Sequence, residues 1–196
     1  INETAAENVS CELYGSSLMR CTWNYGRNAP KDINYTVLMR QEQHEKECEN
    51  YQNDRTRKTG KCEFRDLNVE SHESICILVE GSDDVQLSVK WFNPLKIDIL
   101  QPPKDISVVN LEHDVILHWT KPDTFYTASN TCFQYIIQDM KRNKEYYANG
   151  GNNTYKVPVP SKNEECTLRM RAKGTLACDM NTNWGEWSEE IQCGKN

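Results

Sequence analysis

Alternating apolar and polar residues dominate the first half of the chain and predict short β-strands. Residues 18–25 alternate and stop at Gly26, and residues 33–39 are rich in β-branched and aromatic side chains. Runs of this kind, bounded by turn-forming residues, are typical of strands. Two more such runs, with a predicted turn between them, follow at residues 74–80 and 85–92.

The second half of the chain repeats this pattern. Strand-like runs occur at residues 106–109, 115–119, 132–138, 155–159 and 167–172. Neither half shows the longer apolar periodicity of a helix. Each half has a tryptophan on an early strand, Trp23 or Trp119, whose default role is core packing. Two halves of about 100 residues, each with about seven short strands, favour an all-β fold of two antiparallel sandwiches.

A stiff segment separates the two halves. Pro102 and Pro103 are adjacent, and neither can donate a hydrogen bond to a β-ladder. We therefore expect one domain over residues 1–101 and a second over residues 102–196.

Composition excludes several classes of protein. The chain has 196 residues, 37% of them hydrophobic and 27% charged, and a formal net charge of −6. A general affinity for nucleic acid needs clustered cations and a positive field, so no nucleic-acid partner is expected. The chain has no run of about 18 apolar residues, so this fragment is not expected to insert directly into a membrane.

Nine cysteines in so polar a chain indicate disulfides rather than a metal site. They form no Cys-x-x-Cys pair, and the four histidines show no zinc-ligand spacing. We therefore expect no metal and no cofactor. Disulfides persist in oxidising compartments, so the cysteine count predicts an extracellular protein.

Sequence alone leaves the connectivity of these cysteines open. Their spacing is compatible with the pairs Cys11–Cys21, Cys48–Cys62, Cys132–Cys178 and Cys166–Cys193. The last pair has a geometric reason, because Cys166 would start one strand and Cys193 would end its antiparallel neighbour. Cys76 is left over, either as a buried inert thiol or as a bridge to another molecule.

Four Asn-x-Ser/Thr triplets agree with an extracellular location. Such triplets are acceptors for N-glycosylation, although each one alone is a weak signal. The four candidate asparagines are Asn2, Asn8, Asn34 and Asn152.

A polar, basic run occupies residues 55–61, between Cys48 and Cys62. Its simplest interpretation is a solvated loop.

Tryptophans and cations stand at complementary spacing near the C-terminus. Arg169, Arg171 and Lys173 are two residues apart and share one face of a predicted strand. The segment Trp184-Gly-Glu-Trp-Ser188 follows, so Trp184 and Trp187 are predicted to stack on these cations from the next strand. Each cation–π contact stabilises by about 0.5–2 kcal/mol.

With these motifs in place, the whole chain resembles the class I (haematopoietin) cytokine receptors. Trp184-Gly-Glu-Trp-Ser188 is similar to the family's Trp-Ser-x-Trp-Ser box, with Gly185 in place of the first serine. The spacing from Cys11 to Cys21 and Trp23 matches the family's opening motif. Within the family, the chain resembles the alpha chains for interleukin-3, -5 and -13 and for granulocyte-macrophage colony-stimulating factor.

The resemblance implies two fibronectin type III-like sandwiches joined at an elbow, where loops of both domains bind a four-helix-bundle cytokine. A shared signalling receptor subunit would then recognise the bound cytokine. Apolar loop residues would be the anchors and charged ones the rim. The candidate contact residues are Arg40, Glu70, Phe125, Tyr126, Leu176, Asp179 and Met180. The family implies a structural role, away from the ligand, for the ladder of Arg169, Arg171, Lys173, Trp184, Trp187 and Ser188.

Other functions stay open from the sequence. The chain is a cell-surface ectodomain of a single-pass type I protein, a secreted decoy for the same cytokine, or a shared low-affinity subunit. Alpha chains of this group usually carry an extra N-terminal domain, and this chain begins at what would be the second domain. It is a truncated form, a naturally short isoform or a two-domain relative. A generic adhesion module would not need the paired cysteines or the tryptophan box. An enzyme is not expected, because the common nucleophile and nucleotide motifs are missing and Asp83 and Asp84 fall in a predicted turn.

Overall fold

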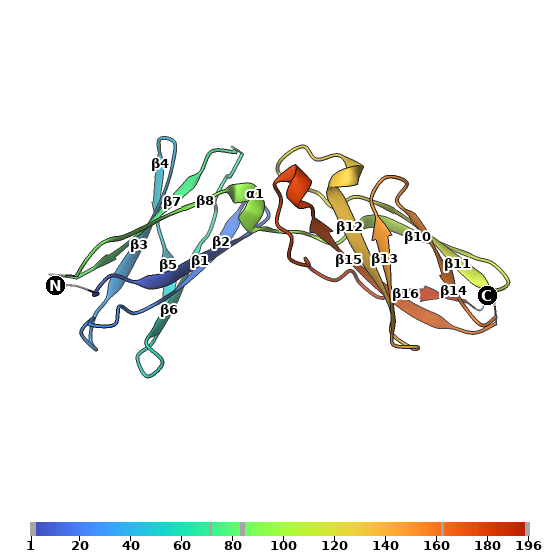
Figure 1. Ribbon diagram of the computed structural model, residues 1–196, viewed down its shortest axis with the longest axis horizontal. Helices are drawn as coiled ribbons and strands as arrows, with labels where there is room; N and C mark the ends of the chain where they lie inside the picture. Colours follow the sequence, from blue (N-terminus) through green and yellow to red (C-terminus); the bar gives the residue numbers. More distant parts are fainter. Residues whose placement is uncertain (1–2, 71, 83–84, 162, 195–196) are drawn as a thin grey trace. The chain divides into compact units, whose positions relative to one another are not determined.

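The computed structural model describes residues 3–194, except residues 71, 83–84 and 162. The chain divides into two compact units, Ile1–Asp98 and Ile99–Asn196. Each unit consists of strands in two layers (Figure 1). The predicted all-β class is confirmed, with fibronectin type III-like sandwiches as its architecture.

Unit 1 is a sandwich of two sheets. The first has the order β5-β6-β2-β1-β9 and the second the order β4-β3-β7-β8, and the neighbours whose register is defined run antiparallel. The strands of the first sheet are β1 (Glu7–Tyr14), β2 (Leu18–Asn24), β5 (Glu49–Asp54), β6 (Thr59–Phe64) and β9 (Asp98–Ile99). Those of the second are β3 (Tyr35–Gln41), β4 (His44–Glu47), β7 (Ile75–Gly81) and β8 (Ser88–Phe92). A short helix, α1 (Pro94–Ile97), follows β8.

The core of unit 1 forms around Trp23. Alternate residues of β2 point inward because side chains alternate along a strand, and Trp23 is buried among them. Its indole meets the rings of Tyr35 and Tyr51 edge to face. Gly60 lies directly opposite Trp23 on β6, and a Cβ atom there would overlap the indole ring. The indole of Trp23 therefore occupies the space that a side chain at residue 60 would otherwise fill.

Unit 2 is built in the same way. Its sheets have the orders β10-β11-β14 and β13-β12-β15-β16. Their strands are β10 (Lys104–Asn110), β11 (Asp114–Thr120), β12 (Phe133–Asp139), β13 (Lys144–Asn149), β14 (Thr154–Pro158), β15 (Cys166–Gly174) and β16 (Ile191–Cys193). Two 3-10 turns occupy Asn130–Cys132 and Leu176–Cys178. Trp119 and Tyr135 are buried in the core, with ring centroids 5.1 Å apart.

The chain has four disulfides, two within each unit. They join Cys11 to Cys21, Cys48 to Cys62, Cys132 to Cys178 and Cys166 to Cys193, which are the pairs favoured by the sequence. Cys166 and Cys193 lie directly opposite each other on β15 and β16, as expected. Cys76 on β7 is a free, buried thiol. Its burial agrees with the interpretation of an inert core residue.

The strands that sequence patterns missed include three polar edge strands and the inner strand β6. Because β6 begins at Thr59, residues 59–61 are not part of the solvated loop that the basic run predicted. β4, β5 and β13 each end a sheet, and most of their residues are exposed. A strand that is solvated on both faces shows no apolar alternation, so its composition does not distinguish it from a loop. Residues 85–87 were expected in a strand but precede β8. The predicted turn at Asp83 and Asp84 lies outside the described residues.

Candidate ligand-binding surfaces

Residues 184–188 run beside β15 and are tied to it through the backbone. The amide of Gly185 donates to the carbonyl of Ala172 at 2.8 Å, and the amide of Ser188 donates to that of Met170 at 2.7 Å. The Ser188 hydroxyl in turn accepts the Met170 amide at 2.9 Å. This pairing holds the tryptophan segment in register with the cations of β15.

The side chains of this segment interleave with those cations. The Arg169 guanidinium lies 4.1 Å from the Trp187 ring centre, and that of Arg171 lies 4.2 Å from the same ring. Arg171 is also 5.5 Å from the Trp184 ring, and the Lys173 ammonium is 4.8 Å from it. The structure therefore contains the stacked Trp/Arg ladder that the spacing of these residues predicted.

The glycine that departs from the family motif lies against another backbone. A Cβ atom at Gly185 would overlap the carbonyl of Leu100. The next amide, of Glu186, donates to that same carbonyl at 2.9 Å. The segment is thus held on both sides, and Gly185 permits the close approach.

Two of the apolar anchors predicted in unit 2 are buried in the structure. Tyr126 is 6% exposed and packs edge to face against half-buried Phe125. Met180 is 2% exposed and fills the space beside Gly174, where a Cβ atom would overlap it. A sandwich has open ends, and apolar loop residues close them, so these side chains complete the core instead of facing a partner.

Leu176 is the apolar side chain of this loop that faces solvent. It is 80% exposed at the start of the 3-10 turn Leu176–Cys178. Asp179 follows in the left-handed conformation and is exposed as well. The Cys132–Cys178 disulfide ties this turn to the 3-10 turn Asn130–Cys132, which immediately precedes β12.

The charged residues predicted in unit 1 lie on the surface. Arg40 is exposed on β3 and forms an ion pair with Glu45 of β4. Glu70 is exposed in the loop before β7 and accepts a hydrogen bond from the Asn68 amide at 3.0 Å. Their placement agrees with a rim position but does not test it.

Sequence reasoning missed an exposed apolar strip that starts just before β8 and continues along it. Trp91 is 65% exposed, and Val89 and Leu87 are about half exposed. Trp91 lies opposite Cys76 of β7, which in turn lies opposite Arg40 of β3. The alternation of these apolar residues was visible in the sequence, but such a row normally faces the core. The structure turns it outward.

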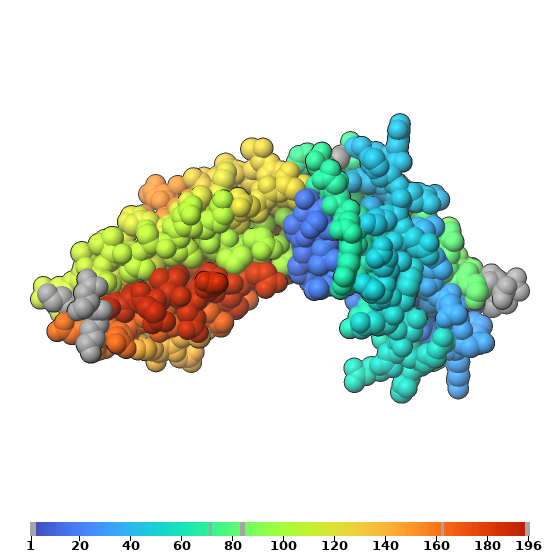
Figure 2. Space-filling view, turned by 180° about the vertical axis from the view of Figure 1, so that it is seen from behind, coloured from blue at the N-terminus to red at the C-terminus, as the bar shows by residue number. Residues whose placement is uncertain are grey.

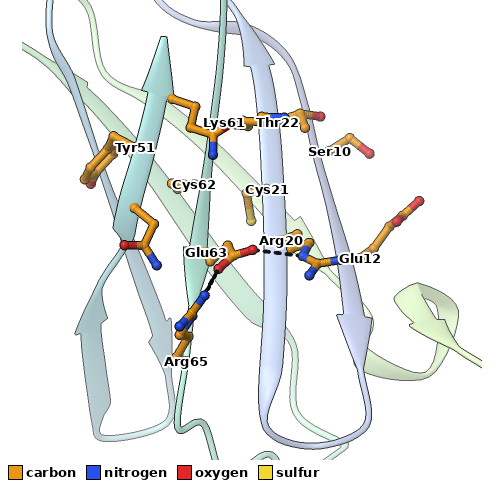
Figure 3. Close-up of a pocket in the computed structure, with 12 residues that line it drawn as sticks. Ser10, Glu12, Arg20, Cys21, Thr22, Tyr51, Lys61, Cys62, Glu63 and Arg65 are labelled. Carbon is orange, nitrogen blue, oxygen red and sulfur yellow. Dashed lines mark hydrogen bonds and ion pairs between the residues drawn. The ribbon is translucent and has the colours of Figure 1, made fainter.

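The outer face of the other sheet carries an open polar groove of about 830 Å³ (Figure 3). Glu63 lies between two guanidinium groups, 3.0 Å from the Nε of Arg20 and 3.0 Å from an Nη of Arg65. Hydrogen bonds from Arg65 and then Arg20 hold the pKa of the Glu63 carboxyl below its usual value. Lys61 lies further along β6, opposite Thr22 of β2.

The described glycosylation candidates are accessible. Asn8, Asn34 and Asn152 are all exposed. Asn2 lies outside the described residues.

Comparisons with known proteins agree on one family. Residues 8–97 match the family model for the interleukin-6 receptor alpha chain, binding. The chain is 26% identical over 189 residues to interleukin-5 receptor subunit alpha of Mus musculus, covering 90% of this chain and 44% of the relative. It is also 26% identical over 218 residues to interleukin-13 receptor subunit alpha-1 of Homo sapiens, covering 98% and 50%. The chain thus spans about half the length of the curated relatives it matches.

A third relative and a solved structure extend this agreement. The granulocyte-macrophage colony-stimulating factor receptor subunit alpha of Mus musculus is 23% identical over 206 residues, covering 96% of this chain and 50% of the relative. A solved structure titled "Cytokine receptor complex - Crystal form 1A" shares the fold with a TM-score of 0.67 at 12% identity, covering 95% of this chain and 96% of that one.

Within the described residues, no helix has both the length and the apolar character needed to cross a membrane. The four disulfides and the β-sandwich fold agree with a receptor ectodomain of this kind. In sequence and in fold, the chain is thus similar to the alpha chains of the class I cytokine receptors.

Proposed function

We propose that this chain is the cytokine-binding module of a receptor alpha chain. It binds a four-helix-bundle cytokine through loops of both units, and a shared signalling subunit recognises the complex. The named relatives are receptor subunits for interleukin-5, interleukin-13 and granulocyte-macrophage colony-stimulating factor, which supports this class of ligand. The proposal places the chain outside the cell, in a cell-surface receptor, with no catalytic step.

The exposure of Leu176 is the observation that supports the proposal most directly. A leucine that is 80% exposed on a loop has no structural role in its own unit. The neighbouring disulfide and 3-10 turn restrain the loop before any ligand binds. A preorganised apolar side chain is an efficient anchor, because little conformational entropy is lost on binding. The carboxylate of Asp179 beside it would favour a ligand with a complementary positive charge.

The apolar strip of β8 is a second contact candidate. Trp91 lies opposite Cys76, and Cys76 lies opposite Arg40, so the three residues form one row across β8, β7 and β3. Arg40 is one of the charged residues predicted to contact the cytokine. Exposed tryptophan with flanking charge is the usual composition of a binding hot spot and its rim. Trp91 therefore takes the place of buried Tyr126 and Met180 among the proposed anchors.

Surface binding of the purified chain to a panel of helical cytokines tests this proposal. The panel comprises interleukin-3, -4, -5 and -13 and granulocyte-macrophage colony-stimulating factor. We expect one of them to bind, and both Leu176→Ala and Trp91→Ser to weaken that binding at least about fivefold. Leu111→Ala, at another exposed leucine of unit 2, is the matched control and should leave binding unchanged.

Two outcomes would count against this assignment. If binding survives both variants, the contact lies elsewhere on the surface. If the chain binds none of the five cytokines alone but binds a preformed cytokine–receptor complex, it is a shared low-affinity subunit. A secreted decoy would show the same binding, so the variants do not separate it from a signalling receptor.

A further inference from the structure

The acidic chain carries one strongly basic segment. Residues 55–65 contain five basic residues and a single acidic one, although the whole chain has a net charge of −6. The proposed cytokine contacts use none of these residues. The structure shows where their charges gather.

Strand alternation places these cations on one outer face. Gly60, Cys62 and Phe64 of β6 point into the core, so Lys61 points outward. Arg20 of β2 joins the same face, because it lies opposite Glu63. The β5–β6 hairpin projects from the body of unit 1 and extends this surface (teal in Figures 1 and 2). We call the surface the cationic face; it consists of Arg20, Arg55, Arg57, Lys61 and Arg65.

The cationic face is hollowed into one continuous trough. The groove of about 830 Å³ adjoins a second of about 940 Å³, and the two share Thr22, Gln52 and Lys61 in their walls. Around the charges the walls carry hydroxyl and amide side chains: Ser10, Thr22, Asn50 and Gln52 in the first groove, and Asn8, Asn24 and Asn53 in the second. Figure 3 shows Lys61 and Arg65 at opposite ends of the first groove.

The positive charge of this face is not cancelled by its acidic residues. Glu63 is shared between Arg20 and Arg65, so these three residues together keep one positive charge. Arg57 lies 3.8 Å from Asp54, yet its side chain is highly exposed. Arg55 and Lys61 are exposed as well. With Glu12 counted, the walls of the two grooves carry five basic and three acidic side chains. A polyanion would thus meet a surplus of accessible cations.

We propose that the cationic face binds a linear sulfated polysaccharide of the glycosaminoglycan class. Sulfates repeat along such a chain, as the cations do along β2, β6 and the hairpin. Basic clusters of this kind are recognised heparin-type patches, and their attraction depends on charge. The open trough admits a chain that continues beyond both ends, and its hydroxyl and amide walls can bond sugar hydroxyls. Of the aromatic residues in its walls, Trp23 is buried and Tyr51 is half-buried, so neither projects as the anchor of a protein contact does.

The protein's own glycan is the competing occupant. Asn8 lies in the wall of the second groove and belongs to an Asn-x-Ser triplet. A glycan attached there would cover part of the trough. The test therefore includes Asn8→Gln.

Calorimetric titration of the 196-residue protein with a size-defined heparin octasaccharide at about 0.15 M NaCl tests the proposal. We expect binding that weakens as salt rises, because bound cations release counterions from the polyanion. Arg57→Glu/Lys61→Glu, two changes in the walls of the second groove, should weaken it about tenfold or more and flatten the salt dependence. Arg27→Glu/Lys144→Glu makes the same change in net charge at exposed sites outside the face and should bind as the parent does. Tryptophan fluorescence verifies that each variant is folded.

Four results would overturn the proposal. Equal losses in the two double variants would mean that net charge alone drives the attraction. Equal binding of desulfated heparin would show that sulfate is not recognised, and tighter binding of a short DNA duplex would point to nucleic acid. If neither the parent nor Asn8→Gln binds the octasaccharide, the face does not recognise this polyanion. None of these results depends on which cytokine binds, so this test and the cytokine test fail independently.

Discussion

At the scale of single residues, Asp98 combines a charge with deep burial. Its side chain is 3% exposed, at the start of β9. Burial disfavours the carboxylate and raises the pKa of Asp98 from 3.8 to about 7. Because the folded pKa lies above the unfolded one, the native state retains this proton. The stability associated with the protonated form is fully present below pH 4 and is lost as the pH rises through about 7.

Asp98→Asn should remove this dependence of the unfolding free energy on pH, because asparagine keeps the shape of the neutral acid and does not ionise. We expect the variant to exceed the parent in unfolding free energy by about 1–4 kcal/mol at pH 8, with the difference shrinking toward pH 4. Urea denaturation at pH 4, 6 and 8 measures the effect. Parallel pH profiles for the two proteins would show that Asp98 ionises freely in the folded state.

At the scale of elements, the Trp/Arg ladder rigidifies an extended segment that belongs to no sheet. Residues 184–188 have backbone hydrogen bonds to β15 on one side and to Leu100 on the other. Arg171 lies between both tryptophan rings, whereas Arg169 stacks on one ring and donates to Gln138 at 2.6 Å. The central position of Arg171 makes it the side chain on which the stack depends most.

Arg171→Gln should therefore destabilise the protein by about 1–2 kcal/mol, since two cation–π contacts are lost. Arg27→Gln, at an exposed arginine of unit 1, should change stability by less than about 0.5 kcal/mol. Thermal denaturation followed by near-UV circular dichroism, which reports on tryptophan packing, measures both. An Arg171→Gln protein as stable as the control would mean that the ladder adds no net free energy. Cytokine binding should survive in the variant, because the ladder is proposed to lie outside the contact.

At the scale of the whole molecule, each unit contains its own core and its own two disulfides. All nine cysteines are described, and each disulfide joins residues of the same unit. Crosslinks within a unit limit the unfolded states of that unit alone, each by about 3–4 kcal/mol in the chain-entropy model. Stability is therefore expected to be organised unit by unit.

Fragments 1–99 and 100–196 should consequently fold separately. This division keeps β9 whole and leaves Leu100 with its hydrogen-bond partner Glu186. We expect dispersed amide signals in the NMR spectra of both fragments and the four disulfides of the intact chain by peptide mapping. A fragment with collapsed signals or scrambled disulfides would show that it needs the other part of the chain.

Sequence alone was sufficient where the signal is local and periodic. Cys166 and Cys193 pair across neighbouring strands, and alternation along β15 places Arg169, Arg171 and Lys173 on one face. The tryptophans that stack on these cations were expected on the next strand, but they lie on an extended segment outside the sheets. Alternation indicated the all-β class, and the motifs carried the resemblance to the receptor family. The polar edge strands β4, β5 and β13 escaped prediction, because what makes them strands is their neighbour and not their composition.

Only the tertiary structure decided which side chains remain accessible. Tyr126 and Met180 have the same apolar character as Leu176, yet they close the end of a sandwich while Leu176 faces solvent. The alternating residues of β8 would normally mark a core face, yet Trp91 points outward. The sequence shows the basic residues at 55–65, but their union with Arg20 in one trough depends on pairing across β2 and β6. Exposure depends on what packs over a residue, and contacts between distant parts of the chain determine that packing.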